Sequence, residues 1–422
     1  MFFGHLKIIL LLGWRNTTRQ KRRALVSFLL IFLSTLLLIT MVGMMKGQYG
    51  QMFRSAIDLY PGPLQITGEG YHEDPNFDRL IYDVSEVTDV LSKNEGVADY
   101  TVRFENFALY SSGEESAGGM LVAIEPEKEK TFSKIEESLV DGEFLTPGDE
   151  QVVYIGSTFA NRLNVKVGDE ISFISNDIYY SISSDIVTVK GIFKTNAGDF
   201  DAMMAFTPKA YFDTIFVTEN VASHIVILPT DIENLEKLKR QINKELDGGP
   251  YQVSTWREFL RELVSLIEMD RNFGLIMIGM FFVIIFFVIM IFTLISVHSR
   301  TKELGIMRAN GTTPNQVAAI LFAETTIISL LAIIAGGISG GFVVWYFYHN
   351  PVPIENAEAL KMAEQYSDMG LQWDPVIQTA FSMFSIFQNM AVIFIMSLLA
   401  VIYPILRVNK LKPVEAIAGG KG

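Results

Sequence analysis

The chain has 422 residues, half of them hydrophobic, with a formal net charge of −13 and no cysteine. Its apolar residues are gathered into long blocks, which excludes an ordinary water-soluble domain and indicates a membrane protein with a soluble portion. Without disulfides, that soluble portion has to bury a sufficient hydrophobic core by itself.

Residues 1–23 carry six basic and no acidic side chains and precede the first apolar block, residues 24–45. Crossing a hydrocarbon core of about 30 Å takes roughly 20 helical residues, so this block is long enough to span a membrane. Its length, and the lack of a small-residue cleavage site after it, favour a retained helix over a cleaved signal peptide.

Residues 46–272 mix strand-like and helical patterns, which predicts an α+β domain with irregularly interleaved elements. Strands are expected over residues 63–70, 99–112, 120–126, 150–156, 169–175, 185–195, 201–208 and 222–230, and helices over 84–96, 156–165 and 231–246.

The end of this domain, residues 254–274, starts with a Ser or Thr cap and runs into the second apolar block at 273–297. Helical spacing puts five apolar side chains on one face: Phe259, Leu260, Leu263, Leu266 and Ile267. We expect one continuous helical stalk from the membrane into the domain.

The loop at 298–316 contains a run of helix formers from residue 300 to 310, followed by Gly311 as a natural helix stop. Thr313 and Pro314 are a good cap and first position for the next helix. A short helix here would suit docking on a soluble partner, although an ordinary charged loop explains the residues about equally well.

The third apolar block, residues 317–346, contains two overlapping G-x-x-x-G pairs, which allow close helix packing in lipid. These TM-packing glycines are Gly336, Gly337, Gly340 and Gly341. The same stretch spells a G-x-S-x-G hydrolase pattern, which we reject because it lies in mid-helix. For Glu324, near the start of the block, a structural or interface role is favoured over a proton pathway.

An outer loop at 347–385, a fourth block at 386–406 and a tail at 407–422 complete the chain. The 298–316 loop has three basic and one acidic residue, and the tail has four and one. The positive-inside rule therefore places both termini and the middle loop in the cytoplasm.

No phosphate-binding loop and no metal-ligand spacing of histidines occurs in the sequence. His72, Glu73 and Asp74 are the one local cluster, which we interpret as a solvated loop. The chain is therefore not expected to be an enzyme or to have a cofactor of its own.

Residues 296–341 resemble the core of FtsX-like (MacB/Lol-type) ABC transporter permeases, where an R-x-x-E-[IL]-G-[IL]-x-R-A-x-G-x-[ST] run follows the second span. The matching residues are Arg300, Glu303, Leu304, Gly305, Ile306, Arg308, Ala309, Gly311 and Thr312, with Glu324 matching an acid at the start of the next span. The tail is similar at Tyr403, Pro404, Arg407, Leu411, Pro413, Glu415 and Ala416, and residues 152–173 are similar at Gly156, Ala160, Leu163, Gly168 and Asp169. Residues 44–71 and the long outer loop look most like the lipoprotein-releasing permeases.

The resemblance implies four transmembrane helices in the bacterial inner membrane, an N-terminal cytoplasmic amphipathic helix at 1–23 and a periplasmic domain between the first two spans. Two permease chains, identical or paralogous, would sit over a dimer of a separate ABC ATPase that binds ATP and Mg. Motion would pass through a cytoplasmic coupling helix at 298–316 and through the stalks, a mechanism called mechanotransmission. The ATPase-coupling residues would be Arg300, Glu303, Leu304, Gly305, Met307, Arg308 and Gly311.

The implied cargo is a lipoprotein, extracted from the outer leaflet and passed to a periplasmic carrier. The expected partners include membrane lipids and no nucleic acid. Export of peptides or antibiotics with a periplasmic adaptor, and signalling to a cell-envelope enzyme, remain alternatives. No substrate-binding residue is assigned, because Met44 and Met45 could contact an acyl chain or ordinary lipid equally well.

Overall fold

The computed structural model describes residues 15, 18–19, 21–195, 197–246, 248–354, 356–368 and 375–409. The chain divides into two compact units. A helical unit comprises residues 1–50, 269–353 and 376–422, and a sheet unit comprises residues 51–268 and 354–375. Most of the expected N-terminal helix at 1–23 and of the tail at 407–422 lies outside the described residues.

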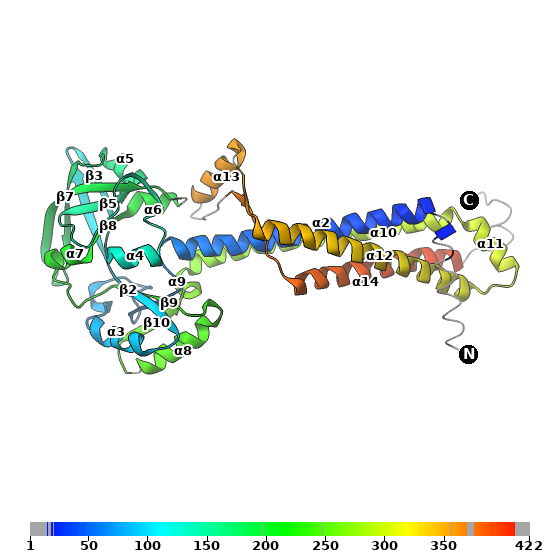
Figure 1. Ribbon diagram of the computed structural model, residues 1–422, viewed down its shortest axis with the longest axis horizontal. Coiled ribbons are helices and arrows are strands. Elements are labelled where there is room, and N and C mark those ends of the chain that lie inside the picture. Colours follow the sequence, from blue (N-terminus) through cyan, green and yellow to red (C-terminus); the bar gives the residue numbers. More distant parts are fainter. Residues whose placement is uncertain are drawn as a thin grey trace. The chain divides into compact units, whose positions relative to one another are not determined.

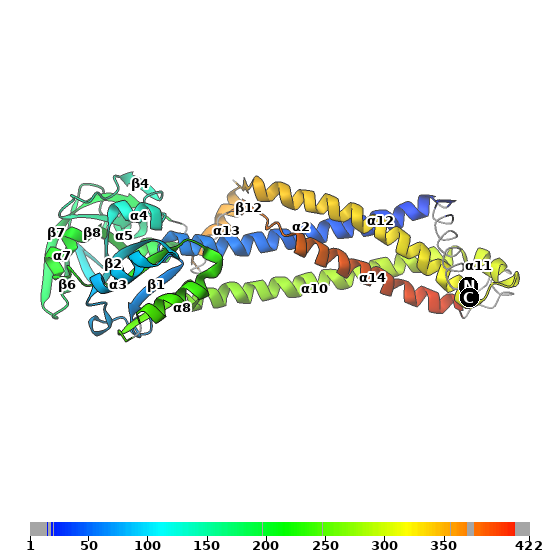
Figure 2. The same cartoon turned by 60° about the horizontal axis from the view of Figure 1, so that its bottom comes forward.

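Four helices in the described chain are long and apolar enough to cross a membrane. They are α2 (Lys21–Leu59), α10 (Arg261–His298), α12 (Pro314–His349) and α14 (Met383–Asn409). Within the helical unit they lie side by side, and the short α11 (Thr301–Ala309) connects α10 to α12 at one end (Figure 2). Aliphatic side chains from all four helices form their common core.

The sheet unit contains ten paired strands in the order β10-β1-β9-β2-β3-β8-β5-β7-β4, with β6 paired to β2 and β7 (Figure 1). The strands are β1 (Leu64–Gly68), β2 (Val97–Ser112), β3 (Glu115–Ile124), β4 (Leu139–Gly142), β5 (Val152–Gly156), β6 (Glu170–Asn176), β7 (Ile182–Phe193), β8 (Met204–Pro208), β9 (His224–Pro229) and β10 (Tyr251–Thr255). The helices are α3 (Val84–Lys93), α4 (Pro126–Phe132), α5 (Ser157–Leu163), α6 (Gly198–Met203), α7 (Lys209–Phe216) and α8 (Leu235–Glu245).

The 16-residue strand β2 belongs to two lobes of this unit. Its first half pairs with β9, in a sheet that also contains β1 and β10 and shares its core with α3 and α8. Its second half pairs with β3 and β6, and the pairs β3–β8, β8–β5, β5–β7 and β7–β6 close a ring. Alternation along β6 points Ile171 and Phe173 into the core of that ring, because successive strand residues face opposite sides.

Each of the eight strands expected from the sequence overlaps an observed strand, and the three expected helices overlap α3, α5 and α8. The patterns did not indicate β4, β10, α4, α6 or α7. In the outer loop the structure adds β11 (Val352–Pro353), α13 (Ala357–Asp368) and β12 (Val376–Ile377).

The expectation of an uninterrupted stalk over residues 254–274 is wrong at one position. A four-residue helix, α9 (Trp256–Phe259), ends at Leu260, whose φ of −97° and ψ of 37° are not helical, and α10 starts at Arg261. The cap is Thr255, which forms a capping box with Glu258. The other stalk helix, α2, instead continues without interruption to Leu59, 14 residues past the expected end of the first span at residue 45.

Candidate functional site

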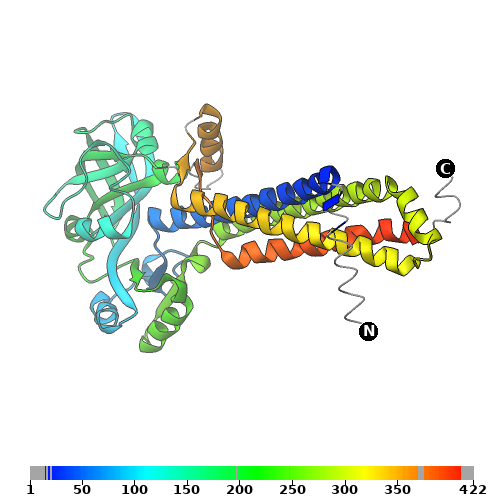
Figure 3. The ribbon, with the colours of Figure 1, turned by 45° about the vertical axis from the view of Figure 1, so that its right-hand side comes forward.

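The short helix α11 is bounded by the signals that its sequence contains. Gly311 follows it with a φ of +93°, a left-handed conformation that glycine adopts without strain. Thr313 then caps α12 in a reciprocal capping box with Gln316, and Pro314 takes the first helical position. The chain therefore reverses tightly between two long helices and presents α11 at the turn (Figure 3).

One face of α11 packs against the helical unit. Leu304 and Gly305 are buried, and Leu304 belongs to a cluster with Val297 of α10 and with Val317 and Leu321 of α12. Met307 is half-buried against the same cluster. These side chains fix the position of α11 relative to α10 and α12.

Arg300 lies on this inner side, with only 6% of its surface exposed. Its Nη1 donates to Glu324 Oε2 at 2.7 Å, and its Nε donates to Glu303 Oε2 at 3.2 Å. The Glu324 side chain is 13% exposed and that of Glu303 is 59% exposed. Glu324 thus has an ion-pair partner within the chain, which accounts for an acid at the start of a long apolar helix.

A small cavity of about 40 Å³ lies beside this ion pair, within the helical unit. Its lining is polar for the interior of an apolar bundle, and it includes residues of all four long helices. The polar members are Arg23, Ser27, Thr293, Ser296, Glu324 and Thr325. The charged end of α2 therefore borders the same interior space as the Arg300–Glu324 pair.

The outer face of α11 is exposed. Lys302, Glu303, Ile306 and Ala309 are accessible, and Ile306 is 46% exposed although it is a large apolar residue. Of the residues expected at a partner surface, Glu303 and Gly311 are exposed, Arg308 is half-buried, and Arg300, Leu304 and Gly305 face the chain itself. Ile306 was part of the sequence match but was not singled out, because helical spacing alone does not say which apolar residue is covered.

The four glycines of α12 contact two different helices. A Cβ atom on Gly336 would lie 2.7 Å from the carbonyl oxygen of Phe32, and Gly340 is close to the α2 backbone one turn further on. Gly337 and Gly341 instead face side chains of α14. A stripe of small residues on each side lets α12 approach both neighbours closely.

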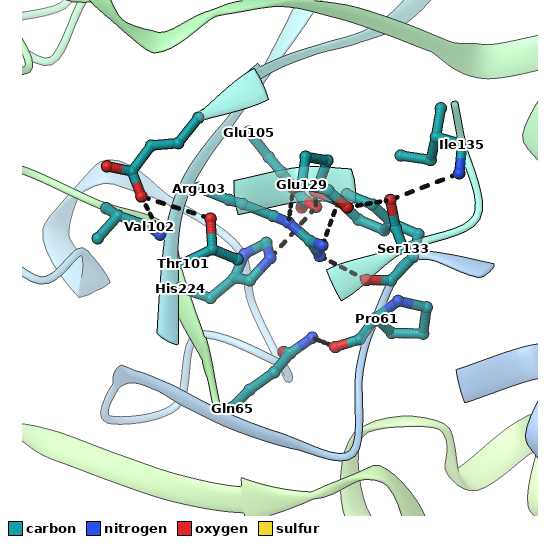
Figure 4. A network of polar contacts seen from close by, with 12 residues as sticks. Pro61, Gln65, Thr101, Val102, Arg103, Glu105, Glu129, Ser133, Ile135 and His224 are labelled. Atoms are coloured by element: carbon teal, nitrogen blue, oxygen red, sulfur yellow. Dashed lines mark hydrogen bonds and ion pairs between the residues drawn. The ribbon is translucent and has the colours of Figure 1, made fainter. Parts of the chain in front are cut away.

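In the sheet unit, the end of α2 is fixed by a buried polar network (Figure 4). Arg103 of β2 and Glu129 of α4 have fully buried side chains, and Arg103 Nη2 donates to Glu129 Oε1 at 2.6 Å. Arg103 also donates to the carbonyl oxygen of Tyr60, directly after α2, and its guanidinium lies 4.0 Å from the centre of the Tyr60 ring. The Tyr60 hydroxyl donates to Glu105 at 2.7 Å. Both the backbone and the side chain at the end of α2 are thus held by β2.

His224 completes this network. Its ring meets that of Tyr60 edge-on, and its Nε2 lies 3.9 Å from Glu105 Oε1. Burial, helped by the nearby positive charge of Arg103, lowers the pKa of His224 well below 6.5, so the ring is neutral at pH 7. Burial also raises the pKa of Glu105, against the opposing effects of the Tyr60 hydrogen bond and Arg103.

The second stalk segment attaches next to the first. β1, which follows α2, pairs antiparallel with β10, which precedes α9, and Leu64 is opposite Thr255. The Trp256 amide donates to the Pro63 carbonyl at 3.1 Å, and the Trp256 ring lies 5.0 Å from that of Phe53 of α2. Both stalk segments are therefore tied to one pair of strands.

The expected solvated loop at residues 72–74 is partly wrong. His72 is half-buried, and its ring stacks on Phe259 with centroids 5.3 Å apart. Burial lowers its pKa. Across the described ranges, no group of three or more His, Asp or Glu residues is placed to hold a metal ion.

Comparison with known proteins places two family regions on this chain. The MacB-like periplasmic core domain matches residues 24–245, and the FtsX-like permease C-terminal region matches residues 275–413. The lipoprotein-releasing system transmembrane protein LolC of Xylella fastidiosa is 21% identical over 421 residues, covering 96% of this chain and 97% of that protein. LolC of Neisseria meningitidis is 19% identical over 96% of this chain and 98% of its own length.

Two further similarities cover parts of the chain. The ABC transporter permease YtrF of Bacillus subtilis is 30% identical over 136 residues, which are 32% of this chain and 30% of YtrF. The crystal structure of the periplasmic region of MacB from Actinobacillus actinomycetemcomitans is 13% identical with a TM-score of 0.37, covering 51% of this chain and 98% of that structure.

Proposed function

The chain belongs to the FtsX-like permeases with a MacB-like periplasmic core domain, and from this we propose that it is the transmembrane subunit of an ABC transporter that releases lipoproteins. Its cargo would be a lipoprotein in the outer leaflet of the bacterial inner membrane, and a periplasmic carrier would receive it. The observation that carries the proposal is the similarity to LolC over 96% of the chain, which includes both the helices and the large domain.

A separate ABC ATPase dimer would supply ATP hydrolysis and would bind ATP and Mg. In this proposal the outer face of α11 docks on the ATPase, through exposed Ile306 and the charged Lys302 and Glu303. Arg300 and Glu324 act indirectly, because their ion pair holds α11 against α12. The exposed apolar residue would fill a pocket on the ATPase, while the charges beside it set the orientation.

Motion of α11 would reach the large domain through α2 and α10. Two observations support mechanotransmission of this kind: α2 is unbroken from Lys21 to Leu59, and the Arg103 network holds the residue that follows it. The charge distribution supports a periplasmic location for the domain and a cytoplasmic one for both termini.

A second permease, identical or paralogous, would complete the transporter. Within its most apolar window only 11% of α10 is buried in this chain, against 44% for α12. The exposed surface of α10 is available to a second permease as well as to lipid.

Export of peptides or antibiotics through a periplasmic adaptor is the second candidate. The local match to YtrF, 30% identical over 136 residues, is to a protein named only as an ABC transporter permease, so it supports a permease of either kind. Both candidates require an ATPase, but they differ in cargo and in the protein bound at the outer domain.

Purification of the chain from its native membrane in mild detergent, followed by mass spectrometry, tests the proposal. A stoichiometric ATPase together with acylated proteins is the expected result. An ATPase with an adaptor and no acylated protein would support export, and an ATPase with a cell-envelope hydrolase would support signalling. Absence of an ATPase would contradict all of these functions.

A further inference from the structure

A cavity of about 720 Å³ lies within the sheet unit, where the loop after β1, the first turn of α6 and the α9–α10 segment meet. Sites for small ligands typically enclose about 300–1,000 Å³ and combine apolar walls with a few polar groups. The apolar wall here comes from one segment and consists of Phe259, Leu260, Leu263 and Leu266.

The charged part of the lining is predominantly acidic. Glu73 is paired with Arg261 at 3.6 Å, and Glu258 is paired with Lys239, which lies outside the lining, at 2.5 Å. Asp199 and Glu262 also line the cavity, and neither takes part in an ion pair among the described residues. Two solvent-exposed carboxylates without an ion-pair partner among the described residues therefore share the cavity with an apolar wall.

His72 adds no positive charge to this lining. Burial lowers its pKa below 6.5, so its ring is neutral at pH 7. Its Nε2 is buried and has no hydrogen-bond partner in the described part of the chain. The cavity thus offers a neutral polar group as well as negative charge to whatever occupies it.

The position of the cavity along the chain suits a ligand with an apolar tail in the membrane. Leu266 precedes the expected start of the second span at residue 273 by seven residues, which is about 10 Å along an α-helix at 1.5 Å per residue. Leu260, at the interruption between α9 and α10, is part of the wall, so a change in the angle between these helices would change the shape of the cavity.

We propose that this cavity binds a cationic peptide segment of an amphiphilic cargo, next to the point where its acyl chains are attached. Lys or Arg side chains of the cargo would contact Asp199 and Glu262, and its apolar atoms would contact Leu263 and Leu266. This inference rests on the proposed release of lipoproteins and adds a charge preference to it. It also couples cargo binding to the stalk, because the wall contains the interruption at Leu260.

The test uses the full-length chain, with its co-purifying partners, in nanodiscs of zwitterionic lipid. The probe is a photoreactive, palmitoylated tri-lysine peptide, and the comparison probe is the matching tri-glutamate peptide. Crosslinked residues are mapped by mass spectrometry. The test variant is Asp199→Asn/Glu262→Gln, and the matched control is Glu114→Gln/Glu115→Gln, which neutralises two exposed acids at the β2–β3 turn of the same unit.

We expect the tri-lysine probe to label residues 256–266 of the native chain. In the double variant the labelling should fall about tenfold, because its neutral amides replace charge-assisted contacts that are roughly twice as strong as neutral ones. The control variant should label like the native chain, and thermal unfolding should show that both variants are folded. Equal labelling by the tri-glutamate probe, unchanged labelling of the double variant, or crosslinking of these residues to a second copy of the chain instead of the probe would overturn the inference.

Release of a purified lipoprotein to a soluble acceptor is measured with the same preparations. Normal release combined with unchanged labelling of the double variant would overturn the cavity assignment and leave the proposed function standing. If the native chain is specifically labelled by the tri-lysine probe but releases no lipoprotein, the proposed function is overturned and the cavity assignment stands.

Discussion

The guanidinium of Arg300 lies 2.7 Å from the carboxylate of Glu324 and ties the start of α11 to α12. Both side chains are largely buried, at 7% and 13% exposure, so solvent screens this pair far less than a surface pair. The second partner of Arg300, Glu303, is mostly exposed. The position of α11 therefore depends more on the acid in the long helix than on the acid in α11 itself.

Glu324→Gln should loosen α11, because Arg300 would lose its buried charged partner. Removing one member of a hydrogen-bonded buried pair costs about 1–3 kcal/mol, which corresponds to roughly 5- to 150-fold faster local opening. Hydrogen exchange of the α11 amides measures this effect. Glu303→Gln is the matched control and should change exchange much less; equal effects of the two substitutions would contradict the assigned role of Glu324.

Ile306→Ser should weaken binding of the ATPase without unfolding the chain, because the side chain is 46% exposed and is not a member of the hydrophobic cluster that packs α11 against α10 and α12. A buried apolar anchor at a protein interface is worth about 2 kcal/mol or more, or about 30-fold in affinity. The amount of ATPase that co-purifies with the chain measures the loss. Ala309→Ser, on the same exposed side of α11, is the control, and normal ATPase recovery with Ile306→Ser would exclude this contact.

Gly336→Ala should destabilise the helical unit, because the added Cβ would lie 2.7 Å from a backbone oxygen of α2, which cannot rotate away. Overpacking of this kind typically costs about 1–3 kcal/mol. Gly279→Ala in α10 has no atom within 4 Å of the added Cβ and should be neutral or slightly stabilising. Thermal unfolding in detergent compares the two, and a similar melting temperature for both would show that α12 and α2 can move apart freely.

Arg103→Met should destabilise the sheet unit by about 3–5 kcal/mol, because it leaves the Glu129 carboxylate buried without its partner. Replacing both residues by Met should recover a large part of that loss, since no charge then remains buried. Urea unfolding gives the free energies. Glu127→Gln, which removes an exposed partner of Lys130, is the control and should cost at most about 0.5 kcal/mol.

The stability of the sheet unit should decrease as the pH falls from 7 to 5. The pKa of His224 is lowered in the folded chain, so the unfolded chain binds a proton near pH 6.5 that the folded chain does not. The free energy of unfolding then falls by up to about 1.4 kcal/mol per pH unit below that value.

His224→Gln should remove the contribution of His224 to the pH dependence of the free energy of unfolding. Hydrogen exchange of the β2 amides at several pH values measures this free energy. The raised pKa of Glu105 acts in the opposite direction, so the difference between native chain and variant is the informative quantity. An unchanged slope in the variant would show that His224 is not the responsible group.

Periodicity along the chain located most strands, because apolar and polar residues alternate along a strand when one of its faces is buried. It could not locate β10, which is short and is positioned by its pairing with the distant β1. It also missed α6, a six-residue helix whose last three residues, 201–203, fall within the strand expected at 201–208. The interruption at Leu260 could not be predicted from the sequence, because nothing in the local sequence forbids a helix there. Its non-helical conformation is set by the surrounding fold.

The position of the candidate site at α11 could be predicted from the sequence, but the side of the helix that is exposed could not. Spacing and glycine placement correctly indicated a short helix between Arg300 and Gly311. The covered side of that helix is set by two contacts. Arg300 pairs with Glu324, 24 residues further along the chain, and Leu304 packs in a cluster with residues of α10 and α12. In the sheet unit, the Arg103–Glu129 pair joins residues 26 positions apart, and no one-dimensional pattern marks two such residues as partners.

The pairing of β1 with β10 has a mechanical consequence. Because Leu64 is opposite Thr255, the two stalk segments leave the ladder at the same end. Opposite displacements of α2 and α9 along the strand direction would load all five residue pairs of the ladder in shear, so that its hydrogen bonds would have to fail together, whereas separating the two segments sideways would open the ladder pair by pair from the Leu64–Thr255 end. A common displacement of both segments leaves the ladder unloaded. The joint therefore transmits a shared push or tilt and resists sliding of one segment past the other.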